Sequence, residues 1–360
     1  MISAFLTASG ALLKRKTKLL FLLCFFMPSV VFSYEFPPER SESDAENEIG
    51  WLVAPLPIVV EGIGTGFPIA ASISNIFKKT DLLMAKTLFK GDFEVSLFSL
   101  SKYPVVDEKL LFSLGFTDFY MPFRSYDRGI DSGKEDYYQT LEKFNSNFVT
   151  LQSQLYNQRL EFLLSYSAGG TKLEKIFDVD GNDFSNIQSP ERSWIDHVIG
   201  TQIDLTDNHL DPSEGLRIGL LHSKTNYEHN DLSDYAVNDI NITAYFPFFE
   251  THTLLFNAFQ SRSNITANGL VDETAVRNKF GLDCDLEKET AACRKTETRR
   301  INYWLKRNQS SKATALGGLN RMRAYSQGRF YAANSSNYVL EYRRSEEHTS
   351  ELQSRETKSY

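Results

Sequence analysis

Apolar and polar residues alternate along much of the chain, with a period of two residues. In the segment DINITAYF (239–246) the even-numbered positions are apolar, and the odd-numbered positions are mostly polar. The same alternation runs through KLLFSLGFTDFYM (109–121), DHVIGTQIDL (196–205) and SNYVLEYR (336–343). Because successive side chains of a β-strand point to opposite faces, the pattern predicts strands of about ten residues with one apolar face and one small or polar face.

The connections between these strands differ in length. Nine strands are predicted, at 66–76, 88–100, 109–123, 146–157, 160–168, 193–206, 215–226, 236–248 and 253–262. The segments 125–140 and 169–192 are long and polar, whereas 157–159, 207–215 and 250–252 are short. Long loops on one side and tight turns on the other are typical of outer-membrane barrels. Such a barrel must close, because lipid offers no hydrogen-bond partners to the backbone groups of an unpaired edge strand. The pattern therefore favours an all-β, transmembrane antiparallel barrel over an exported β-sandwich.

The N-terminal residues predict export. The basic cluster KRKTK (14–18) precedes the apolar run LLFLLCFFMPSVVFS (19–33), which is shorter than the segment that a transmembrane helix needs to span the bilayer. Residues 1–33 therefore read as a secretory signal peptide, with cleavage expected after Ser33, and residues 34–54 as a polar periplasmic spacer. The predicted barrel occupies residues 55–343.

The net charge of the chain limits the kinds of partner that we expect. The formal net charge of -7 argues against a nucleic-acid binder, which needs cations to neutralise phosphates.

Removal of the signal leaves Cys284 and Cys293, close together in a polar segment. In an exported protein this spacing suggests a loop-stapling disulfide, with two free thiols as the alternative. No cofactor and no metal site is expected.

The stretch ALGGLNRMRAYSQGRF (315–330) gathers arginines around an aromatic residue in a glycine-rich loop. The fragments LGG, RMRAY and GRF, followed by a strand ending in LEYR, resemble the BamA/TamA-type bacterial surface antigen barrels. DNHLDPSEGLRIGL (207–220) resembles the hairpin turn of that family, D-x-x-x-x-P-x-x-G. The matching turn residues are Asp207, Asp211, Pro212 and Gly215.

The resemblance implies a lumenal loop at 308–335 inside a sixteen-stranded barrel, with eleven strands before the loop. The motif arginine of that loop meets an acidic residue on the inner wall, and the matching segment here is Met322-Arg323-Ala324-Tyr325, with alanine in place of the family's glycine. Gly317, Gly318 and Gly328 would permit the tight path of the loop. Arg321 and Arg329 are expected either within this loop or as surface charges facing lipopolysaccharide. Two further strands are expected within 270–307.

The last residues, 344–360, read RSEEHTSELQSRETKSY. Up to Ser354 they match the translation of a common sequencing-library adapter. We therefore expect a non-native tail, with the natural sequence departing after Arg343 and about four closing strands absent.

By resemblance, the protein would assist insertion or translocation of proteins or lipids at the outer membrane of a Gram-negative bacterium. Its partners would be outer-membrane lipid, lipopolysaccharide and client outer-membrane proteins. The alternative is a passive pore or structural surface barrel, since residues 34–55 are too few for the POTRA domains that often precede such barrels. Catalysis is not expected. A lipid hydrolase would need a histidine and a serine on one face, and the adjacent His222 and Ser223 point to opposite faces.

Overall fold

The computed structural model describes most of the chain between residues 49 and 344. The segments outside the description are 1–48, 56–57, 61–63, 77–79, 89–92, 107–108, 127–130, 134–135, 185–188, 210, 250–251, 285–290, 319–320, 323, 326–327 and 345–360. The predicted signal peptide and nearly all of the predicted tail therefore lie outside the described residues.

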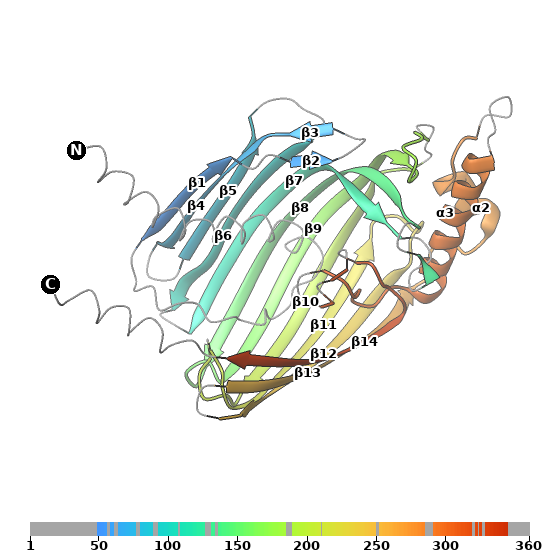
Figure 1. Ribbon diagram of the computed structural model, residues 1–360. Coiled ribbons are helices and arrows are strands. Elements are labelled where there is room, and N and C mark those ends of the chain that lie inside the picture. Colours follow the sequence, from blue (N-terminus) through green and yellow to red (C-terminus); the bar gives the residue numbers. More distant parts are fainter. Residues whose placement is uncertain are drawn as a thin grey trace.

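Twelve strands form one antiparallel sheet in the order β1-β4-β5-β6-β7-β8-β9-β10-β11-β12-β13-β14 (Figure 1). Their bounds are β1 Gly50–Pro55, β4 Pro68–Ile76, β5 Thr80–Thr87, β6 Glu94–Val106, β7 Leu110–Ser125, β8 Tyr138–Leu155, β9 Leu160–Phe177, β10 Arg192–Asp204, β11 Gly215–Tyr227, β12 Asp234–Pro247, β13 His252–Ala267 and β14 Asn334–Arg344. A separate two-stranded sheet pairs β2 (Ile58–Val60) with β3 (Gly64–Gly66). Neighbours in the sequence are neighbours in the large sheet, so the fold is an all-β meander.

The sheet curves around a hollow, and the segment between β13 and β14 lies partly within that hollow (Figure 1). The long connections gather at one end of the strands, together with the two helices α2 (Glu273–Phe280) and α3 (Ala291–Ser310). Tight turns lie at the opposite end, for example residues 156–159 between β8 and β9. Within the described residues, no pairing joins β1 to β14. In that part of the chain, no helix is long and apolar enough to cross a membrane.

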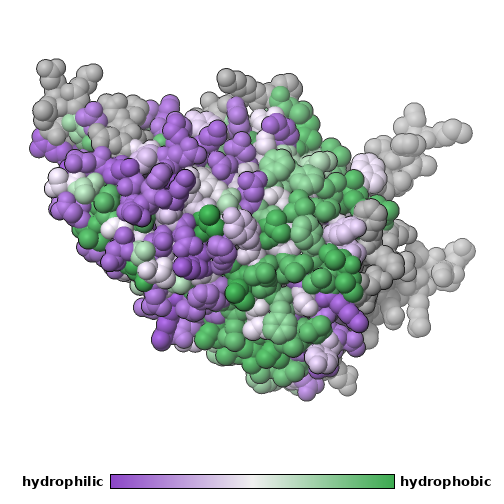
Figure 2. Space-filling model, turned by 180° about the vertical axis from the view of Figure 1, so that it is seen from behind, coloured by the Kyte–Doolittle hydropathy of each residue, from purple (hydrophilic) through white to green (hydrophobic). Residues whose placement is uncertain are grey.

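The two faces of the sheet differ as the alternation predicts. On β12, Ile242 is 37% exposed on the convex face, whereas its neighbour Thr243 is 8% exposed on the concave face. Figure 2 shows the convex side, where apolar side chains gather in a broad zone over the strands and polar ones gather toward the long-loop end. Exposed apolar side chains of this face include Phe116, Val149, Leu151, Phe162, Leu164, Ile195, Ile199, Ile203, Leu220, Ile240, Phe246, Phe256, Tyr338 and Leu340. The predicted apolar face is confirmed.

An aromatic cluster fills part of the concave side. Phe144 lies with its ring centroid 6.3 Å from Phe119 of the neighbouring strand and 6.3 Å from Trp194 of β10. Both phenylalanines are 2% exposed or less, and they pack with Val95 and Leu97 of β6. This hydrophobic cluster therefore lies inside the curve of the sheet, toward its N-terminal half, and two further clusters involve the segment 276–304 and Leu282.

The prediction of two strands within 270–307 is wrong, because α2 and α3 occupy that segment. The Asp272 side chain accepts a hydrogen bond from the backbone N–H of Ala275, which caps α2. Val276 and Phe280, four residues apart, are both 0% exposed and pack against Trp304 of α3. The apolar residues of this segment therefore follow a helical spacing rather than alternation.

Several strand bounds also differ from prediction. The strand predicted at 88–100 overlaps β6 only at residues 94–100, and its first residues, 88–93, lie in the connection between β5 and β6. The strand β9 continues to Phe177, so that the second long connection is 178–191 rather than 169–192. The strand β1 begins at Gly50, inside the segment predicted as spacer. Eleven strands of the large sheet precede the loop before β14, which equals the number that the family resemblance implies.

Candidate functional site within the curved sheet

The segment 311–333, here called the inner loop, is held to the concave faces of β12 and β13 by side-chain hydrogen bonds. The Ser311 hydroxyl donates to Oγ of Ser263 at 2.6 Å, and the Thr314 hydroxyl donates to Oδ2 of Asp239, also at 2.6 Å. The backbone N–H of Thr314 donates to the Ser261 hydroxyl at 3.0 Å. All three partners lie on the concave face of their strands, so small or polar residues of that face anchor the loop.

The inner loop then folds back on itself. Leu316 and Phe330 exchange two backbone hydrogen bonds of 2.7 and 2.9 Å, and the Gly318 N–H donates to the carbonyl of Tyr325 at 3.0 Å. Gly317 and Gly318 have φ angles of 103° and 106°, which disfavour any residue with a Cβ atom. The glycine pair therefore permits the reversal that starts the tip of the loop. Gly328 closes it with a φ of 66°.

Arg329 is buried at 7% exposure, so of its two expected placements the structure has the one within the loop and not the surface charge. Its Nη2 donates to the carbonyls of Ser132 and Gly133, the latter at 2.9 Å, in the connection between β7 and β8. The guanidinium also lies 4.3 Å from the ring centroid of Tyr126 and 4.9 Å from that of Phe330. One side chain thus links the inner loop to a connection six strands away from β14.

The other arginine, aromatic and small residues of the loop motif differ in how deeply they are buried. The guanidinium carbon of Arg321 lies 3.4 Å from the ring centroid of Phe259, on the concave face of β13. Met322 is half-buried, Ala324 and Tyr325 are exposed, and the Tyr325 ring meets Phe330 edge-on at 5.0 Å. Arg323, the residue that the resemblance selects, lies outside the described residues, so its partner stays a prediction.

The turn between β10 and β11 holds the second group of predicted residues. The Asp207 carboxylate accepts hydrogen bonds from the Ser213 hydroxyl at 2.5 Å, from the Ser213 N–H at 2.9 Å and from the Glu214 N–H at 3.0 Å. Pro212 is buried and Asp211 exposed, and Gly215 has a φ of 113° with its backbone against Leu205, where a Cβ would collide with the carbonyl oxygen. The turn is closed by its own first and last residues.

A buried ion pair beside this turn was missed by sequence reasoning. Asp204 and Arg217 are directly paired in register across β10 and β11, with side-chain exposures of 4% and 8%. Arg217 donates through Nε at 3.0 Å and Nη2 at 2.7 Å to Oδ2 of Asp204, and through Nη2 to the carbonyl of His209 at 2.7 Å. Both charges occupy the polar face of the alternation, and only the register of the hairpin could have brought them together.

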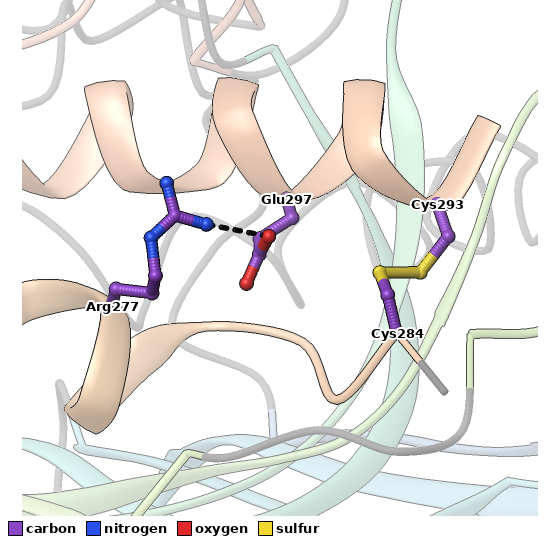
Figure 3. The surroundings of a disulfide bond; sticks show 4 residues. All are labelled: Arg277, Cys284, Cys293 and Glu297. Atoms are coloured by element: carbon purple, nitrogen blue, oxygen red, sulfur yellow. Dashed lines mark hydrogen bonds and ion pairs between the residues drawn. A yellow bond between two sulfur atoms is a disulfide. The ribbon is translucent and has the colours of Figure 1, made fainter. Parts of the chain in front are cut away.

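The two helices form a cap at the long-loop end, closed by a disulfide between Cys284 and Cys293 (Figure 3). Arg277 of α2 donates to the Glu297 carboxylate of α3 at 2.6 Å, so an ion pair and a disulfide join the same two segments. The cap is also held to the sheet, because Arg299 pairs with Asp136 at 2.8 Å and Lys279 with Asp231 at 2.8 Å. The cap therefore lies against the long connections at that end of the strands (Figure 1).

His222 and Ser223 do not form a catalytic pair, because their side chains lie on opposite faces of β11. His222 lies on the convex face with Nδ1 2.8 Å from Oδ1 of Asn238, while Ser223 belongs to the concave face. Within the described part of the chain, no group of three or more His, Cys, Asp or Glu side chains is placed to hold a metal ion. The arrangement at the inner loop is one of anchoring contacts.

Comparison with known proteins gives matches among solved structures alone. No family model and no curated protein matches the chain. Among solved structures, the crystal structure of BamA from Haemophilus ducreyi lacking POTRA domains 1–3 matches with a TM-score of 0.38 and 12% identity. The match covers 61% of this chain and 41% of that chain. Similarity at this level carries no information on function, and the fold class rests on the sheet itself.

Proposed function

We propose that this chain forms the wall of an outer-membrane β-barrel. The observation that carries the proposal is the convex face, where apolar side chains are exposed along strands β7 to β14. A contiguous zone of exposed apolar side chains marks a surface that contacts another apolar phase or a partner. A lipid environment accounts for it, because a membrane barrel alternates apolar residues outward with polar residues inward.

Within that barrel, the inner loop would stabilise the curvature of the wall. Hydrogen bonds from Ser311 and Thr314 fix one part of the loop to β12 and β13, and Arg329 fixes another part to the connection between β7 and β8. A loop that crosses the concave side leaves less room for an open channel. This crossing favours a role in insertion or translocation of proteins or lipids at the outer membrane over a passive pore.

Depletion of the protein followed by quantification of other outer-membrane proteins and lipids tests this role. An insertion or translocation factor predicts falling levels of clients in the outer membrane and their accumulation in the periplasm. Complementation with Arg329→Gln should restore less than wild type, whereas Arg262→Gln, at an exposed convex position of β13, should restore fully. Unchanged client levels together with altered uptake of small solutes would instead establish the passive pore. Recovery of the chain from the soluble periplasmic fraction would overturn the barrel itself.

A further inference from the structure

We propose that a cavity under the C-terminal end of α3 binds a phosphate group. The cavity has a volume of 140 Å³ and lies where α3 passes into the inner loop. Its lining includes Tyr303, Lys306, Arg307, Ser310, Lys312 and Tyr331. Three cations and two phenol rings thus line this cavity. None of these five side chains takes part in the hydrogen bonds that anchor the inner loop to β12 and β13.

The cations of this cavity are not balanced by carboxylates. Arg307 donates to the hydroxyl of Tyr227 at 2.7 Å and to that of Tyr303 at 3.2 Å. The ammonium of Lys312 lies 5.1 Å from the ring centroid of Tyr331. Among the described residues, no aspartate or glutamate forms an ion pair with Lys312 or Arg307, although other cations of the cap, such as Arg277, do have carboxylate partners. Lys306 is exposed, whereas Arg307 and Lys312 are half-buried, and partly buried cations without counter-charges favour a bound anion.

The negative end of the α3 dipole does not remove this imbalance. Cations are common in the last turn of a helix because its free carbonyls carry partial negative charge. Here the Lys306 carbonyl accepts from the Ser310 hydroxyl at 3.0 Å, and the Arg307 carbonyl accepts from the Ser311 N–H at 2.8 Å. Two of the last carbonyls are therefore already bonded to the chain's own donors.

The directions in which the pKa values of Lys312 and Tyr303 are shifted agree with a positive potential in the cavity. Burial and the neighbouring Arg307 both lower the pKa of Lys312, although the nearby Tyr303 opposes this. Burial would raise the pKa of Tyr303, but Arg307 and Lys312 outweigh burial and lower it. A bound anion would relieve the repulsion between the two cations and raise the pKa of Lys312 toward its ordinary value.

The donor set fits a phosphate group better than a planar carboxylate. Lysine and arginine side chains line the cavity from α3 and from the inner loop, and a tetrahedral oxyanion can accept hydrogen bonds from several such directions. The phosphate could belong to a soluble phosphate ester or to the sugar phosphates of lipopolysaccharide. Both ligands would present the same phosphate group to the cavity, and the titrations below distinguish between them.

Titration calorimetry on the folded, detergent-solubilised protein tests the proposal, with inorganic phosphate added at constant ionic strength. Wild type should bind phosphate in preference to chloride, and Lys312→Met should weaken binding at least tenfold. Lys312→Arg should retain most of it. Lys295→Met, at an exposed position near the start of α3, is the matched control and should bind like wild type.

A second titration with lipopolysaccharide, intact and dephosphorylated, distinguishes the two sources. Binding of inorganic phosphate, or phosphate-dependent binding of lipopolysaccharide alone, supports the site and identifies its ligand class. Absence of phosphate-dependent binding in both titrations, or equal affinity of Lys312→Met and wild type, would overturn it. Because these titrations need no membrane function, their outcome is independent of the proposed role in the outer membrane.

Discussion

The ion pair between Asp204 and Arg217 gives the sharpest prediction on stability. Replacing Asp204 by alanine leaves a guanidinium at 8% exposure with a single remaining acceptor, the carbonyl of His209. Removing one partner of a buried pair typically costs about 3–5 kcal/mol, because the other charge stays buried without compensation. We expect a loss of this size in the free energy of unfolding of Asp204→Ala.

The reverse substitution should cost less. In Arg217→Met the Asp204 carboxylate keeps the Thr206 N–H at 3.0 Å, the Thr206 hydroxyl at 2.5 Å and the ring of His209 at 2.8 Å. Three remaining partners reduce the expected cost to about 1–3 kcal/mol. The double variant Asp204→Ala/Arg217→Met should be no less stable than Asp204→Ala alone, since the uncompensated charge is then removed as well.

Urea unfolding in lipid vesicles, followed by tryptophan fluorescence, measures these differences. The control is Asp211→Ala, an exposed aspartate in the same turn, which should change the unfolding free energy by less than about 0.5 kcal/mol. Additive effects in the double variant, or a larger loss for Arg217→Met than for Asp204→Ala, would refute the assignment of a buried, asymmetrically compensated pair.

Three further predictions follow from other parts of the molecule. Ile242→Arg on the convex face should destabilise the membrane-inserted protein by about 2–4 kcal/mol. Ser223→Arg, at a half-buried concave position of β11, should cost much less, as measured by refolding into vesicles, and equal losses would contradict the assignment of faces. Burial would raise the pKa of Asp207, but hydrogen bonds from Ser213 and Glu214 outweigh burial and lower it, so its contribution is present above about pH 4 and lost as the pH falls through the lower folded value. Unfolding at graded pH should therefore show a steeper acid loss for wild type than for Asp207→Asn, and parallel curves would disprove the link. Reduction of the Cys284–Cys293 disulfide should loosen the cap by about 2–3 kcal/mol, detected as faster proteolysis within α3, whereas an unchanged cleavage rate would show that the ion pairs suffice.

The strands with clear alternation could be predicted from the sequence, and the reason is visible in β11 to β13. The predicted bounds of these strands lie within about two residues of the observed ones at most ends. Their two faces differ in polarity, so the alternation of apolar and polar residues is clear along each strand and allows only one pairing register. The same reasoning failed at β5 and β6, where Leu88 lies between the two strands and continues the apolar character that the pattern relies on.

The helical cap and the buried charges could not be obtained in this way. Asp272 at the start of α2 is a helix-capping signal, and the spacing of Val276 and Phe280 is helical, but the expected strand count took precedence over both. The contacts of Arg329 with Ser132 and Gly133 join residues nearly 200 positions apart, so nothing local in the sequence specifies them. Local patterns therefore give the wall, whereas the contacts within the hollow depend on how the wall curves.

The central claim is that the convex face lies in lipid. Spin labels attached singly to cysteines at positions 238 to 246 of β12, in a variant otherwise free of cysteine and reconstituted in vesicles, test it most directly. Accessibility to oxygen should peak at the even positions, such as Ile240 and Ile242, and fall at the odd positions, which are buried or half-buried on the concave face. An oxygen profile without this period of two, or even positions that are fully open to a water-soluble nickel complex, would contradict the account.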